Sequence, residues 1–197
     1  MSRGNYDMPP QQYGRYREMT VEDLLLENRI VFLAGVIDER SASLVMMRLL
    51  YLQNINKEAD INLYINSPGG MVDQTLAIYD TMRFLSCPIA TYCIGRAESG
   101  GAVILTAGTK GKRFSLPHAR MMLHQPWGGV YGQAADVQIQ AEEILKNKRM
   151  LNEILALHTG QPMEKIEKQT ERDYFMSPQE AKAFGLIDEI LEETPAK

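Results

Sequence analysis

The sequence has few of the residues that bind metals and no segment suited to crossing a membrane. Its 197 residues include only two cysteines and three histidines, and Cys87 and Cys93 do not form a set with metal-ligand spacing. We therefore expect no metal site, and we expect both cysteines to be reduced core thiols in a cytoplasmic protein. No apolar run approaches the roughly 20 residues of a membrane span. The polar N-terminus also lacks the apolar core of a signal peptide.

An excess of positive charge is missing as well. The 21 Lys and Arg residues are outnumbered by 25 Asp and Glu residues, which gives a formal net charge of −4. A sequence-independent nucleic-acid binder needs a basic field, so no nucleic-acid partner is expected. The apolar content of 45% is too high for a disordered chain, and the length suits one domain.

We expect an N-terminal arm followed by a single α/β domain. Residues 1–19 are rich in Gly, Pro, Gln and Tyr without periodicity, which predicts a flexible or loop-forming arm, or simply a frayed terminus. The domain at 20–197 begins with a helix capped by Thr20. Apolar strands are predicted at 29–33, 61–66, 89–94 and 121–124, and further helices at 41–53, 75–84 and 102–107. This alternation indicates crossover connections and a largely parallel sheet.

A long helix is predicted at 133–158, where neither Gly nor Pro interrupts the apolar stripe. Its 26 residues would span roughly 40 Å, more than a small domain needs to cover its own sheet. Such a helix must lie along the surface or project and pair with another subunit. His158 in the last turn, next to the helix dipole, and Gly160 beyond it predict the helix end. Helices at 162–173 and 177–184 and an apolar segment at 186–191 are expected to follow.

Two glycine-containing loops follow predicted strands. At 67–70, Ser-Pro-Gly-Gly would let the backbone approach a ligand and direct N–H groups at an anion, although a tight turn explains the pair equally well. The second loop places Ser99 between Ala97 and Gly101 on a strand-to-helix turn. This resembles the G-x-S-x-G nucleophile elbow with Ala for the first Gly. A serine that only caps the following helix is the other interpretation.

A serine nucleophile needs a base and an orienting carboxylate. His118 follows a proline in a predicted turn and His158 belongs to a helix end, so His124, at the end of an apolar strand, is the candidate base by elimination. Spacing does not choose the carboxylate. The open candidates are Asp38, Asp73, Asp136, Asp173 and Asp188.

Six short segments carry a resemblance to a known family. They are YINSPGG at 64–70, IYDTM at 78–82, LHQP at 123–126, ALHTG at 156–160, TERD at 170–173 and GLID at 185–188. In this order, from about Leu24 to Leu191, they resemble the ClpP family, the proteolytic subunits of ATP-dependent Clp proteases. The resemblance implies a ClpP/crotonase-like α/β fold, with repeated β-β-α units in a spiral head domain. The region at about 125–160 would be a protruding handle, and the N-terminal arm an axial loop.

Carried over position by position, the resemblance assigns the catalytic roles. Ser99 would be the nucleophile, His124 the general base and Asp173 the orienting carboxylate, with the backbone N–H groups of Gly70 and Gly100 as the oxyanion hole. The implied activity is that of a serine endopeptidase that hydrolyses peptide bonds of unfolded proteins. It needs no cofactor of its own, because ATP is used by the partner unfoldase and not by this chain.

The resemblance also implies partners. Copies of this chain or of paralogues would form two stacked heptameric rings, a tetradecamer, fed by an AAA+ unfoldase of the ClpX, ClpA or ClpC type in protein quality control. Inter-ring contacts would map to Gln133, Asp136 and Arg172, and unfoldase docking to Tyr64, Phe114 and Leu116.

The sequence departs from the family at the nucleophile, which suggests a divergent paralogue. Ala-Ser-Met is usual there, but this chain has Glu98, Ser99 and Gly100. Glu98 puts a carboxylate beside the serine, facing either the imidazole or solvent, and Gly100 would loosen the turn. Asn62 also replaces an aromatic residue of the docking pocket. The alternatives are a catalytically weak, ClpR-like structural subunit and, less well supported, a crotonase-type acyl-CoA enzyme.

Overall fold

Helices and strands alternate along most of the chain in the computed structural model, which describes residues 19–126, 128–129 and 131–192. The predicted arm lies outside these residues except for Met19. The elements are α1 (Val21–Glu27), β1 (Ile30–Ala34), α2 (Glu39–Ile55), β2 (Ile61–Ser67), α3 (Val72–Phe84), β3 (Ile89–Glu98), α4 (Gly100–Thr106), β4 (Arg113–Ser115), β5 (Arg120–Leu123), α5 (Ala134–Thr159), α6 (Met163–Thr170), β6 (Tyr174–Met176), α7 (Pro178–Phe184) and β7 (Glu189–Ile190). The predicted α/β class with one long helix is confirmed.

The strands form one sheet in the order β1-β2-β3-β4-β7, and β5 pairs with both β3 and β6. All pairs are parallel except β5 with β6, so the prediction of a largely parallel sheet is confirmed. The sequence did not predict β4 or β6, which have three residues each. The helix predicted at 162–173 was too long, because α6 ends at Thr170 and the chain then becomes extended.

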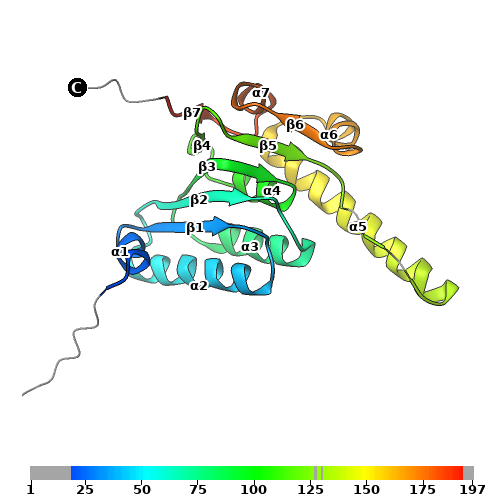
Figure 1. Ribbon diagram of the computed structural model, residues 1–197, viewed down its shortest axis with the longest axis horizontal. Helices are drawn as coiled ribbons and strands as arrows, with labels where there is room; N and C mark the ends of the chain where they lie inside the picture. Colours follow the sequence, from blue (N-terminus) through cyan, green and yellow to red (C-terminus); the bar gives the residue numbers. More distant parts are fainter. Residues whose placement is uncertain (1–18, 127, 130, 193–197) are drawn as a thin grey trace, which may run out of the picture.

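The two faces of the sheet differ. Helices α2, α3 and α4 lie on one face (Figure 1), where alternate residues of β2, such as Leu63 and Ile65, are fully buried. The intervening residue Tyr64 belongs to a stack of aromatic rings on the other face. That stack runs across four strands, with centroid separations of 5.4, 4.6 and 5.0 Å, in the order Phe32, Tyr64, Tyr92 and Phe114.

Helix α5 extends well beyond the sheet (Figure 1), so of the two arrangements that its predicted length left open, lying along the surface or projecting, the structure shows projection. Its 26 residues are mostly exposed in the N-terminal half, whereas Asn152, Ile154 and Leu155 are buried near the other end. Gly160 ends the helix in the left-handed conformation with a φ of 73°. The helix is therefore anchored to the domain by its C-terminal third and presents the rest of its surface outward.

The prediction that His158 interacts with the dipole of this helix was wrong. Burial, together with the charges of Arg83 and Arg113, lowers the pKa of His158 to about 4, so the imidazole is neutral near pH 7. Its Nε2 lies 3.1 Å from the hydroxyl of Tyr79 instead. Arg113 is itself buried, and its Nε donates to Asp188 Oδ2 at 2.8 Å.

We expect this histidine to make stability depend on pH. Between pH 6.5 and about 4 the unfolded chain binds a proton at His158 that the folded chain does not, so the free energy of unfolding falls as the pH is lowered through this window. Carboxylates with a lowered pKa, such as Glu171, add to the pH dependence of the free energy of unfolding mainly below about pH 4.5. Urea unfolding between about pH 7 and pH 5 should show this slope, and His158→Gln should flatten it. An unchanged slope in the variant would contradict the assignment.

Candidate active site

Ser99 occupies a sharp turn between β3 and α4. Its φ of 54° and ψ of −122° lie outside the usual regions for a residue with a side chain, at a cost of about 1–3 kcal/mol. Its N–H donates to Met122 O at 2.8 Å, which fixes the turn against β5. The side chain does not cap α4, so the interpretation as a capping serine is wrong. The hydroxyl instead lies 2.9 Å from Nε2 of His124.

The imidazole of His124 lies between the serine and a carboxylate. Its Nδ1 is 3.1 Å from Oδ1 of Asp173, and the side chains are 18% and 61% exposed respectively. The antiparallel pairing of Leu123 with Tyr174 brings the two residues together across β5 and β6. Of the five carboxylates that spacing left open, Asp173 is therefore the one beside the imidazole.

The glycine loop after β2 lies directly on the serine turn. A Cβ added to Gly69 would be 2.7 Å from Ser99 Cβ and 2.8 Å from Gly100 N, and one added to Gly70 would be 2.1 Å from Ile37 O. A side chain at residue 69 would therefore collide with the serine turn, and one at residue 70 would collide with the backbone of Ile37. The N–H groups of Gly70 and Gly100 have no hydrogen-bond partner within the described part of the chain. The family resemblance predicts that this pair of N–H groups binds an oxyanion, and we call the pair the oxyanion site.

Glu98 takes neither of the two orientations considered from the sequence. Its carboxylate lies 3.5 Å from Arg96, and its side chain is only 17% exposed. It does not line the cavity beside Ser99. The carboxylate is thus paired on the strand rather than directed at the imidazole or at open solvent.

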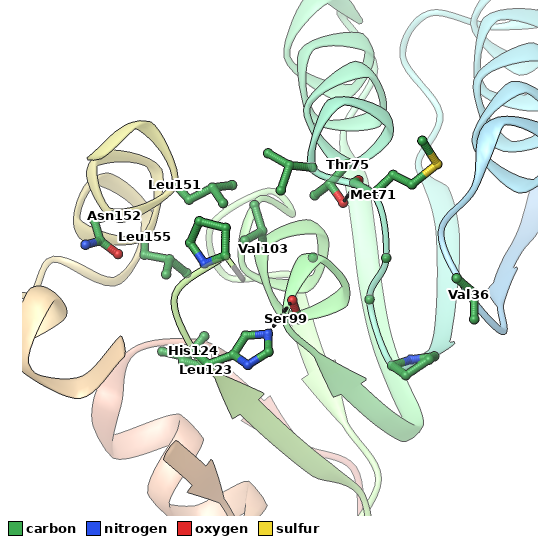
Figure 2. A pocket seen from close by; sticks show the side chains of 16 residues that line it. Val36, Met71, Thr75, Ser99, Val103, Leu123, His124, Leu151, Asn152 and Leu155 are labelled. Atoms are coloured by element: carbon green, nitrogen blue, oxygen red, sulfur yellow. Dashed lines mark hydrogen bonds between the residues drawn. The ribbon is translucent and has the colours of Figure 1, made fainter. Parts of the chain in front are cut away.

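A cavity of about 460 Å³ opens beside Ser99 and His124 (Figure 2). Helices α3 and α5 flank it, and both residues of the oxyanion site are part of its wall. Most of its other wall residues are apolar, among them Val36, Met71, Val103, Leu123, Leu151 and Leu155. The arrangement can place an extended chain with an apolar side chain next to a hydroxyl, an imidazole and two N–H donors.

Comparison with known proteins agrees with this geometry. Residues 13–194 match the Clp protease family. The chain belongs to the Clp protease family. It is 57% identical over 186 residues to ATP-dependent Clp protease proteolytic subunit 1 of Rhodopirellula baltica, which covers 94% of this chain and 82% of that protein. Among the described residues, no helix is long and apolar enough to cross a membrane.

The residues that the family resemblance assigned to ring contacts lie in two separate places. Gln133 and Asp136 are exposed at the N-terminal end of α5, the end farthest from the sheet (Figure 1). Arg172 is exposed in the turn between α6 and β6, directly before Asp173. One subunit therefore does not bring these three side chains together.

Two of the residues assigned to unfoldase docking, Tyr64 and Phe114, lie on the face of the sheet opposite α2, α3 and α4 (Figure 1). Tyr64 and Phe114 belong to the aromatic stack, and Leu116 is 39% exposed just after β4. Sequence reasoning missed Phe32 and Tyr92, which complete the stack. The available signal was that each is an aromatic residue inside a predicted strand, as Tyr64 is; the structure adds the register that aligns them.

A buried polar link joins the long helix of this Clp protease family member to the active-site turn, and sequence reasoning also missed it. Thr170 Oγ1 donates to Asn152 Oδ1 at 3.1 Å, and both side chains are buried. Gln125 directly follows His124, and its N–H donates to the carbonyl of Thr170 at 2.6 Å. Helix α5 is thereby connected to the segments that carry His124 and Asp173.

Proposed function

We propose that this chain is the proteolytic subunit of an ATP-dependent Clp protease and acts as a serine endopeptidase on unfolded polypeptides. One observation carries the proposal: Ser99 Oγ, His124 and Asp173 form a continuous hydrogen-bonded chain beside the oxyanion site. A nucleophile hydrogen-bonded to a base that a carboxylate orients is the arrangement that acyl transfer requires. Membership of the Clp protease family supports the same reaction.

The geometry suggests how each step proceeds. His124 Nε2 accepts the proton of Ser99 Oγ as that oxygen attacks the peptide carbonyl, and Asp173 accepts from Nδ1–H and stabilises the imidazolium. The N–H groups of Gly70 and Gly100 donate to the tetrahedral oxyanion, each worth about 3–4 kcal/mol of barrier. His124 then protonates the leaving amine. Water hydrolyses the acyl-enzyme by the same route in reverse.

The cavity favours an apolar side chain next to the cleaved bond. Its volume of about 460 Å³ and its apolar wall, which includes Leu151 and Leu155 of α5, suit a side chain of medium or large size. A charged side chain would lose its hydration there without gaining an opposite charge. Unfolded segments expose such apolar side chains, whereas folded proteins bury them.

Assembly into two stacked heptameric rings, of this chain alone or with paralogues, belongs to the same proposal. Helix α5 exposes Ile139 and Leu145, which are 66% and 64% exposed and suit burial between rings, with Gln133 and Asp136 at the helix start. The aromatic stack, on the sheet face opposite α2, α3 and α4, suits an AAA+ unfoldase, which would consume the ATP. A cytoplasmic location remains a prediction.

A serine-directed fluorophosphonate tests the proposal. We expect it to label Ser99, identified by peptide mass spectrometry, in particles whose native mass corresponds to a multiple of 22.3 kDa and not to the monomer. A correctly assembled barrel that never labels would favour the alternative, a ClpR-like structural subunit. Turnover of CoA thioesters that survives Ser99→Ala would instead favour a crotonase-type enzyme.

A further inference from the structure

Thr75, one turn into α3, contacts the segments that carry both groups of the oxyanion site. Its hydroxyl donates to the carbonyl of Met71 at 2.9 Å, one residue after Gly70. The residue is only 1% exposed and forms part of the cavity wall beside Ser99 (Figure 2). A single buried side chain thus reaches from the glycine loop toward the first turn of α4.

The same side chain fills the space beside Gly100. A Cβ added to Gly100 would lie 2.3 Å from Thr75 Oγ1, 3.1 Å from its Cγ2 and 3.3 Å from its Cβ. Because the closest of these atoms is the hydroxyl oxygen that donates to Met71 O, a Cβ at residue 100 would force the threonine out of the rotamer that makes this hydrogen bond. The missing side chain at residue 100 and the branched side chain at residue 75 are therefore sterically complementary.

The backbone at Gly100 needs a packed neighbour to keep a single conformation. It begins α4 directly after Ser99, whose φ of 54° is already strained, and glycine has more accessible backbone conformations than any other residue. Its N–H can serve the oxyanion site only while the peptide between residues 99 and 100 keeps its orientation. Thr75 is stiff because it is branched at Cβ, and its hydrogen bond to Met71 O fixes it further.

We propose that Thr75 is a positioning residue that holds the N–H of Gly100 in the oxyanion site. The proposal rests on the function proposed above. Thr75 acts through Gly100 by packing and through the segment after Gly70 by its hydrogen bond to Met71. Since an oxyanion forms only during the reaction, loss of positioning lowers kcat and leaves KM almost unchanged.

The experiment measures peptide hydrolysis by Thr75→Gly, Gly100→Ala and the double variant. The fluorogenic substrate has alanine at the cleaved position, because a small side chain should bind equally well in the larger cavity that Thr75→Gly leaves. Each single variant is expected to lower kcat about tenfold or more, with KM within about twofold. The kcat of the double variant should recover to within about threefold of the wild-type value. Affinity for a peptide boronate, which forms a tetrahedral adduct with a serine hydroxyl, should fall in proportion to kcat.

Thr81 provides the matched control. It lies on the same helix and its hydroxyl donates to Ala77 O at 2.8 Å, the same pattern, but it does not line the cavity. Thr81→Gly should leave kcat within about twofold. Equal losses in Thr75→Gly and Thr81→Gly, or a double variant no better than Gly100→Ala, would overturn the positioning role. If the wild-type protein neither hydrolysed peptides nor reacted with the fluorophosphonate at Ser99, the proposed function would be overturned, and the positioning role with it.

Discussion

Replacing Ser99 with alanine is expected to lower kcat for peptide hydrolysis by about 10⁴-fold or more, the loss typical of removing a serine nucleophile. The variant loses the Oγ that lies 2.9 Å from His124 Nε2, so no covalent intermediate forms. The oxyanion site and the cavity remain, and they leave only weak residual catalysis. A fluorogenic peptide with an apolar side chain at the cleaved position measures the loss.

Ser86→Ala is the matched control for this measurement. Ser86 is exposed in the turn after α3, and its hydroxyl contacts only Gln53 in the described chain, so activity should stay within about twofold. Native mass and thermal unfolding of both variants should match the unchanged chain. If Ser99→Ala kept more than about one hundredth of the activity, a nucleophile other than Ser99 would be responsible.

Much of the fold follows from local patterns that the sequence displays openly. Helix α5 is a 26-residue stretch without Gly or Pro, and the start of α1 carries a capping box between Thr20 and Asp23. Strands β4 and β6 show no such pattern, because three residues are too few to establish a period. They exist because long-range pairing stabilises them, as when β6 pairs with β5.

The residues of the candidate site likewise fall into those that local sequence patterns suggest and one that depends on long-range strand pairing. The small neighbours of Ser99 and the strand end at His124 are local features, so spacing alone could suggest both residues. Asp173 is 49 positions from His124, and its place depends on the register between β5 and β6, which no local pattern encodes. The resemblance to a family supplied that residue.

Two residues near the nucleophile show that separation along the sequence does not predict which side chains act on the active-site turn. Glu98 is adjacent to Ser99, yet residues two apart on a strand share a face, so its carboxylate pairs with Arg96 at 3.5 Å. Thr75 is 24 positions before Ser99 in the sequence and has the pattern of an ordinary helix residue. Its relation to Gly100 appears only when α3 and α4 are packed together.

Replacing Asp173 should have the second largest effect, and its size should depend on the substitute. The carboxylate is 61% exposed and has only His124 as a hydrogen-bond partner in the described chain. In Asp173→Asn the amide is therefore free to turn its oxygen toward Nδ1–H and to keep the imidazole tautomer, so only the negative charge is lost. We expect kcat to fall about 10²–10³-fold, less than the roughly 10⁴-fold loss seen when the wrong tautomer is enforced.

Asp173→Ala should lose more, about 10³–10⁴-fold in kcat, because only water remains to orient the imidazole. Asp80→Asn, an exposed carboxylate on α3 that does not line the cavity, is the control and should stay within about twofold. Steady-state kinetics of the three variants on one peptide separates charge from orientation. Equal losses for Asn and Ala would mean that charge alone matters, whereas losses below about tenfold in both would mean that Asp173 does not orient His124.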